Sequence, residues 1–209
     1  YVLQGVLYDA LGERAVEMAD LNAAPALLGR HNWQNAAAAY AAAIGVGVAP
    51  QDAAEALATF GGLAHRMQEI ARVGRVRFVN DSKATNADAA RQAMQSYPRF
   101  HWIAGGRAKA GGIDGLADLF PRVAHAWLIG EAAPDFARTL EGRAPATGCG
   151  TLERAVQAAF AAAKAEGGEA VVLLSPACAS FDQFPDFEAR GEAFAAAVDA
   201  LSSPAAAQG

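Results

Sequence analysis

The sequence predicts an α/β fold in which a mostly parallel sheet carries helices on both faces. After about residue 63, short runs of β-branched and aromatic residues alternate with apolar residues at helical spacing, which is typical of parallel sheets. The run from Ala170 to Leu174 is apolar throughout, as expected for a strand buried on both faces. Apolar residues make up 53% of the 209 residues, enough to build one large domain, or one domain and part of another.

Composition excludes several classes of protein. A net charge of −5 without a basic stripe argues against a nucleic-acid partner. No run approaches the roughly 18 apolar residues of a membrane helix, so we expect no membrane insertion. Cys149 and Cys178 are too few and too far apart for a disulfide framework or a zinc site, which favours reduced thiols in a cytoplasmic protein.

We also expect a monomer. The first residue is Tyr1 rather than Met, so we expect a piece of a longer protein.

The first part of the chain predicts short strands followed by two helices. Asn32 is a suitable N-cap for a helix that runs through Ala36 to Ile44, because this run consists of strong helix formers. A second helix is expected to begin near Pro50. The pair Gly61-Gly62 is the best candidate for a boundary between domains. The domains are therefore expected at residues 1–62 and 63–209.

The second part predicts alternating strands and helices. Thr85 and Asp88 have the spacing of a capping box, so a helix is expected to start there. Strands are expected from Leu63–Gln68 to a turn at Val73-Gly74, and at Arg75–Asn80, Phe100–Ala104, His125–Ile129 and Ala170–Leu174. Further helices are expected from Asp114, around Phe136, from Thr151 and from Glu188.

Polar side chains follow three of these strands, in the segments Asp81–Asn86, Gly105–Lys109 and Ser175–Ser180. In a parallel sheet the three strand ends lie at one edge, where ligands of α/β proteins bind. Taken alone, the first segment reads as an ordinary capped turn between a strand and a helix. The candidate pocket contains two lysines, three hydroxyls and two aromatic walls, which suits a small dicarboxylate or an amino acid. These residues are Lys83, Lys109, Ser82, Thr85, Ser180, Phe181 and Phe187.

Neither standard phosphate-binding loop is present in the chain. The glycines at 105, 106, 111 and 112 miss the pattern G-x-G-x-x-G, and no segment has the form G-x-x-x-x-G-K-[ST]. We therefore expect that nothing in this chain holds a triphosphate on its own.

Four motifs carry a resemblance to a known family. They are Gly-Arg-His-Asn-x-x-Asn-Ala, Gly-Leu-x-His-Arg, Asn-Asp-Ser-Lys-Ala-Thr-Asn and Leu-Ser-Pro-Ala-Cys-Ala-Ser-Phe-Asp-Gln-Phe. In order and spacing, from Gly29 to Val198, the chain resembles the D-glutamate-adding Mur ligases (UDP-N-acetylmuramoyl-L-alanine:D-glutamate ligases). The resemblance implies that residues 1–62 are the end of a central ATPase domain. It also implies that residues 63–209 are a dinucleotide-fold-like C-terminal domain that binds the amino acid.

The resemblance also implies a reaction and its residues. ATP, with magnesium, phosphorylates the terminal carboxylate of UDP-N-acetylmuramoyl-L-alanine, and the amine of D-glutamate attacks the acyl phosphate. Asn32 and Asn35 would meet the adenine, and the catalytic residues Arg66, Asp81 and Lys83 would reach the ribose and phosphates across a cleft between domains. The residues implied for D-glutamate are Ser82, Thr85, Lys109, Ser180, Phe181 and Phe187. Magnesium would take most of its ligands outside this chain, and its ligands within the chain are unknown.

Several alternatives stay open. The chain could belong to another three-domain amino-acid ligase, either one that adds L-glutamate or one of the folylpolyglutamate type. It could also be a non-catalytic amino-acid-binding domain. The residues do not distinguish D- from L-glutamate, because both offer the same charges. His65 could lie near the phosphates or make a structural hydrogen bond. His101 and His125 read as edge or core histidines, and Cys178 reads as a small buried residue.

Overall fold

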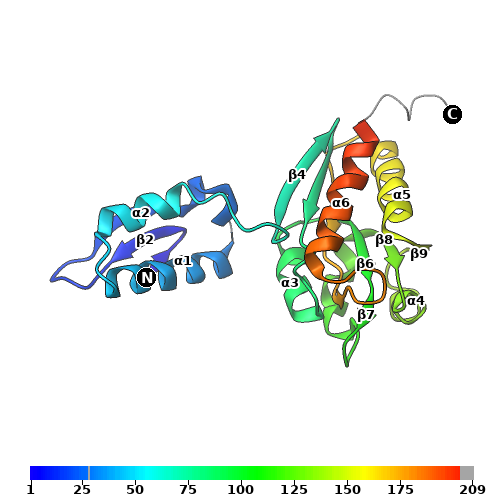
Figure 1. The fold of residues 1–209 in the computed structure, drawn as a ribbon, viewed down its shortest axis with the longest axis horizontal. Helices are drawn as coiled ribbons and strands as arrows, with labels where there is room; N and C mark the ends of the chain where they lie inside the picture. The colour runs from blue at the N-terminus through cyan, green and yellow to red at the C-terminus, as the bar shows by residue number, and fades with distance from the viewer. Residues whose placement is uncertain (28, 203–209) are drawn as a thin grey trace. The chain divides into compact units, whose positions relative to one another are not determined.

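The computed structural model describes residues 1–27 and 29–202, and the chain divides between Leu63 and Ala64 into two compact units (Figure 1). The first unit is a small antiparallel sheet with two helices. Leu7, Leu21 and Tyr40 are among the buried residues of its core. Its elements are β1 (Val2–Leu3), β2 (Val6–Asp9), β3 (Val16–Asp20), the 3-10 helices η1 (Leu21–Ala23) and η2 (Pro25–Leu27), α1 (Arg30–Gly45) and α2 (Pro50–Ala58).

The second unit confirms the α/β fold with a mostly parallel sheet. Its six-stranded sheet has the order β4-β5-β10-β6-β8-β9. Only the edge strand β4 pairs antiparallel with its neighbour, and the other neighbours pair in parallel. The strands are β4 (Gln68–Val73), β5 (Val76–Asn80), β6 (Phe100–Gly105), β8 (Val123–Ile129), β9 (Ala146–Gly150) and β10 (Ala170–Leu174). A separate two-stranded ladder joins β7 (Arg107–Ala108) to β11 (Cys178–Ala179).

Helices cover both faces of this sheet, as expected (Figure 1). The neighbours Phe78 and Val79 of β5 are fully buried in different core clusters, because successive side chains of a strand point to opposite faces. The Val79 cluster includes side chains of α3, η3 and α4, and the Phe78 cluster includes those of α5 and α6. These helices are α3 (Ala87–Gln95), the 3-10 helix η3 (Asp114–Arg122), α4 (Ala133–Leu140), α5 (Leu152–Ala165) and α6 (Phe187–Ser202).

Some element boundaries differ from those expected. The first strand of the second unit begins only at Gln68, because the residues before it form a turn with His65 and Met67 at positive φ. Asn86, not Thr85, caps α3, since its side chain accepts from the N–H of Ala89 at 2.9 Å. Gly29, with φ of 97°, precedes α1 at the position expected for Asn32.

Two further differences concern the sheet and its coverage. The segment at Asp114 forms a 3-10 helix that follows Ile113, and Asp114 lies in its first turn. The sequence did not predict β9, whose residues Ala-Thr-Gly-Cys-Gly are mostly small and lack the bulk typical of strands. Across residues 1–27 and 29–202, no helix has the length and apolar character needed to cross a membrane.

Candidate functional site

The three polar strand ends lie at one edge of the sheet, as expected. They follow the neighbouring strands β5, β10 and β6, which run in parallel. Backbone hydrogen bonds tie the segments together beyond the strands. The N–H of Asp81 donates to Leu174 O at 2.8 Å, and the N–H of Gly105 donates to Pro176 O at 2.9 Å. The edge is therefore a connected surface rather than three independent loops.

Asp81 directly follows β5 at this edge and is 5% exposed. Its carboxylate accepts from the N–H of Met67 at 3.2 Å and from Ser175 Oγ at 2.8 Å. Burial raises the pKa of Asp81 to about 7, against the smaller opposing effect of these hydrogen bonds and of the charge of Arg66. A carboxyl group that titrates near neutral pH at the end of a strand is typical of functional sites.

Ser82 is fully buried, and its hydroxyl is used within the protein. It donates to Phe187 O at 2.8 Å and accepts from Arg190 Nε at 2.9 Å. The segment after β5 is thereby joined to the start of α6. The structure thus gives Ser82 a connecting role, and contact with substrate stays a prediction.

Arg190 is a central residue that the sequence analysis missed. It is 1% exposed and donates to three uncharged acceptors, Ser82 Oγ, Ser82 O at 2.8 Å and Cys178 O at 3.0 Å. Burial lowers its pKa to about 10. Its guanidinium therefore bridges the segments that follow β5 and β10. The sequence does contain a signal for its burial. Arg190 lies three residues after Phe187 and four before the buried Phe194, a helical spacing that places it on the buried side of α6.

A second hydrogen-bonded group surrounds Asn80, which the sequence analysis did not name as a site residue, and includes His65. Its side-chain amide donates to Gly191 O at 2.9 Å and to His65 Nδ1 at 3.1 Å, and its oxygen accepts from the N–H of Ser82 at 3.2 Å. The imidazole lies so close to α6 that a Cβ at Gly191 would come within 2.1 Å of His65 Nδ1. The structure thus gives His65 a structural hydrogen bond. Its carbonyl also accepts from the N–H of Lys83 at 3.0 Å.

Backbone strain is concentrated around this edge. In the described part of the chain, the non-glycine residues with positive φ are Gln4, His65, Met67 and Ala177. The last three lie in the segments that surround Asp81. Each such conformation costs roughly 1–3 kcal/mol, and such strain clusters where a site requires it.

The other expected site residues of the second unit differ in exposure. Lys83 is exposed, and its Nζ lies 3.9 Å from the centre of the Phe187 ring. Thr85 and Phe187 are half-buried, Arg66 and Lys109 are exposed, Ser180 is buried, and Phe181 is 63% exposed. In the β7–β11 ladder, Ala108 pairs with Cys178 and Arg107 with Ala179. Lys109 and Ser180 therefore follow opposite ends of this ladder.

The expected nucleotide contacts are divided between the units. Asn32 and Asn35 lie in the first two turns of α1, in the first unit. Arg66, Asp81 and Lys83 lie in the second. In the described residues no group of three or more His, Cys, Asp or Glu side chains could hold a metal ion.

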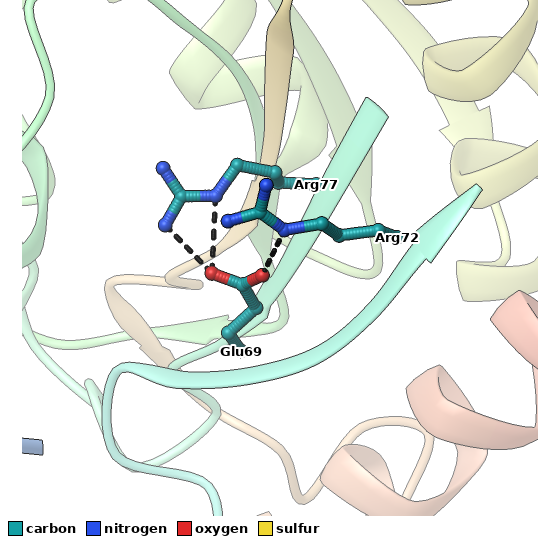
Figure 2. Close-up of polar contacts among 3 residues, drawn as sticks. All are labelled: Glu69, Arg72 and Arg77. Carbon is teal, nitrogen blue, oxygen red and sulfur yellow. Dashed lines mark hydrogen bonds and ion pairs between the residues drawn. The ribbon is translucent and has the colours of Figure 1, made fainter. Parts of the chain in front are cut away.

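A charged cluster on the β4–β5 hairpin lies outside this site (Figure 2). Glu69 accepts from Arg72 at 2.6 Å and from Arg77 at 2.6 Å, and the two arginines pair directly across the strands. Partial burial raises the pKa of Glu69, but the hydrogen bonds and charges of Arg72 and Arg77 together outweigh it and hold this pKa below its usual value. The guanidinium of Arg77 also lies 5.9 Å from the centre of the Tyr97 ring.

Known proteins with similar sequences include UDP-N-acetylmuramoylalanine–D-glutamate ligases. The chain is 70% identical over 206 residues to a UDP-N-acetylmuramoylalanine–D-glutamate ligase of Caulobacter sp. (strain K31), covering 99% of this chain and 44% of the relative. It is 57% identical to the ligase of the same name from Rhizobium etli, and the match covers 93% of this chain and 42% of that relative. The chain thus spans less than half the length of the relatives that it matches.

Solved structures share the fold at low sequence identity. A UDP-N-acetylmuramate–alanine ligase from Thermotoga maritima matches with a TM-score of 0.61 at 14% identity, over 90% of this chain and 41% of that one. A pseudomurein peptide ligase type C from Methanothermus fervidus also gives 0.61, at 17% identity, over 96% and 41%.

The family model described as "Mur ligase, glutamate ligase domain" matches residues 65–178, more than half of the chain. Together with the similar sequences, this match confirms the resemblance drawn from the four motifs. The chain therefore belongs to the Mur ligase family, and the matched residues are those of its glutamate ligase domain.

Proposed function

We propose that the full-length protein that contains this chain is an ATP-dependent ligase of peptidoglycan precursor synthesis. It would add D-glutamate to UDP-N-acetylmuramoyl-L-alanine. ATP would convert the terminal carboxylate of the nucleotide sugar into an acyl phosphate, which the amine of D-glutamate would attack with release of phosphate. The names of relatives that are 70% identical support this reaction.

One structural observation carries the proposal: the three polar strand ends form a single connected edge. The hydrogen bond from Ser175 Oγ to Asp81 and those from Arg190 to Ser82 and Cys178 join the segments after β5 and β10. An amide-forming ligase must hold the amine close to the activated carboxylate, and such positioning lowers the barrier by several kcal/mol. An edge that is joined by hydrogen bonds in this way supports that task.

Within this proposal the residues of the edge have distinct roles. Lys109 would pair with a carboxylate of D-glutamate, and Thr85 and Ser180 would offer hydroxyls beside it. Lys83 would place its charge near the phosphate group as negative charge develops there. Asn32 and Asn35, in the first unit, would contact the adenine of ATP. Magnesium would neutralise phosphate charge, with most of its ligands outside this chain.

The test is an assay of ADP release by the full-length protein. We expect release that requires both UDP-N-acetylmuramoyl-L-alanine and D-glutamate, and no release from this 209-residue chain alone. Release with L-glutamate but not with D-glutamate would assign the protein to another class of amino-acid ligase. Glutamate binding without any ADP release from the full-length protein would indicate a binding domain.

A further inference from the structure

The segment from Ser180 to Phe184 follows β11 and forms a tight turn that begins with two of the predicted D-glutamate residues, Ser180 and Phe181. The carbonyl of Ser180 accepts from the N–H of Gln183 at 3.0 Å and from the N–H of Phe184 at 2.8 Å. The turn leaves Phe181 63% exposed while Ser180 stays buried. The position of both side chains therefore depends on what holds this turn in place.

Asp182 attaches the turn to the end of another strand. Its Oδ2 accepts from the N–H of Glu131 at 3.0 Å, just after β8. A Cβ at Gly130 would lie 2.1 Å from Asp182 Oδ2 and 2.9 Å from the Cα of Gly106. The segments that follow β6, β8 and β10 therefore pack together at one point, and only glycine fits at position 130.

A second contact attaches the same turn to the edge of the sheet. Gln183 Nε2 donates to Gly150 O at 2.8 Å, at the end of β9. Phe184 packs against the core cluster that includes α5 and α6. The turn is thus held by its middle residues, while Ser180 and Phe181 precede these attachments.

We propose that Asp182 is a positioning residue for the amino-acid substrate: its hydrogen bond to Glu131 holds Ser180 and Phe181 where D-glutamate binds. This inference rests on the proposed function. The nucleotide residues Asp81 and Lys83 are held by other groups, namely Ser175, Met67 and the carbonyl of His65. Loss of the Asp182 contact should therefore weaken amino-acid binding more than nucleotide binding.

An electrostatic role is the competing explanation. The charge of Asp182 also acts on Arg107 and Arg190, which it helps to keep protonated. Asp182→Asn separates the two explanations, because the amide oxygen can still accept from Glu131 while the charge is lost. Glu131→Gln is the matched control, since it removes a charge from the same point and leaves the backbone N–H intact. Its exposed side chain pairs with Arg107 at 3.2 Å.

The experiment compares steady-state kinetics of these variants in the full-length protein. Asp182→Ala should raise KM for D-glutamate about ten-fold or more, and change KM for ATP by less than about two-fold. Asp182→Asn should restore KM for D-glutamate to within about three-fold of wild type, and Glu131→Gln should match wild type. If Asp182→Ala does not fold, Gln183→Ala takes its place and should likewise raise KM for D-glutamate without a comparable rise in KM for ATP.

Other results would overturn the inference. Equal increases in both KM values would show a general loss of structure, and an Asn variant as defective as the Ala variant would show that charge is what matters. An unchanged KM for D-glutamate in both Asp182→Ala and Gln183→Ala would also refute it. A wild-type protein that releases no ADP with D-glutamate would instead refute the proposed function, whatever the variants do.

Discussion

Two regions of the second unit differ in how their arginine side chains are paired. On the β4–β5 hairpin, Glu69 forms ion pairs with Arg72 and Arg77, and the side chains of these residues are 34%, 60% and 32% exposed (Figure 2). All three residues lie within nine positions of one another. Exposed pairs of this kind are worth about 0–1 kcal/mol each, because water and salt screen them.

At the strand ends, Arg190 is buried and has uncharged hydrogen-bond acceptors. It connects α6 to Ser82, which is 108 positions away in the sequence. A buried polar group without its partner loses its full hydration, so each of these bonds is expensive to break. The comparison teaches that the candidate site is stabilised by directional hydrogen bonds of buried groups. Ion pairs on the surface contribute little to the stability of the protein.

The largest effect is expected for Arg190→Met. This change keeps an apolar stem and removes the guanidinium, which leaves the carbonyls of Ser82 and Cys178 without these donors. The free energy of unfolding should fall by about 3–4 kcal/mol. Urea denaturation measures it, with Arg72→Met as the matched exposed control, for which little or no loss of stability is expected. Similar losses in the two variants would contradict the comparison.

A second prediction concerns Asp81, whose buried carboxyl has a pKa of about 7 in the folded protein. Because this pKa is raised, the folded state binds a proton more tightly than the unfolded state. The carboxyl's contribution to stability is thus present at acid pH and is lost as pH rises towards and through about 7. Asn cannot ionise, so Asp81→Asn removes this pH-dependent loss of stability. The variant should therefore be more stable than wild type at pH 8 by roughly 2–3 kcal/mol.

The control for this prediction is Asp118→Asn. The exposed Asp118 pairs with Arg91, which holds its pKa below the usual value, so the sign is reversed. This variant should be slightly less stable than wild type at pH 8. The measurement is urea denaturation at pH 4 and pH 8. A stability difference between Asp81→Asn and wild type that is the same at both pH values would show that the carboxyl of Asp81 is not shifted.

The smallest effect is expected for Glu69→Gln. The change leaves Arg72 and Arg77 facing each other across the hairpin without a carboxylate between them. The loss of stability should be less than about 1 kcal/mol and should shrink in high salt, because the cluster is partly exposed. Denaturation at two salt concentrations measures it. A salt-independent loss as large as that of Arg190→Met would mean that the hairpin cluster, too, behaves as a buried network.

The strands and the shared edge could be predicted from the sequence because their signals are local. Apolar runs mark the strands, and parallel pairing then fixes where their polar ends lie. The cap of α3 was placed one residue early, since Thr85 and Asn86 are both good caps and only the fold selects between them. The edge strand β9 gave no signal because its small side chains lack strand character.

The network behind the site could not be predicted in the same way. Arginine is almost always exposed, so the burial of Arg190 depends on carbonyl groups that other segments supply. Likewise, Asn80 donates to the carbonyl of Gly191, 111 positions away in the sequence, and His65 lies against the same residue of α6. The candidate ligand-binding residues were suggested by their positions in motifs, whereas the residues that hold them in place were revealed by three-dimensional contacts.

The central claim is that this edge binds D-glutamate, and NMR titration of the 209-residue chain with each glutamate enantiomer tests it most directly. We expect D-glutamate to shift the amide signals around Thr85, Lys109, Ser180 and Phe187. Lys109→Ala should weaken this binding by about one to two orders of magnitude, as for the loss of a charge-assisted contact. Shifts confined to other parts of the chain, or identical titrations of the wild type and Lys109→Ala, would contradict the claim.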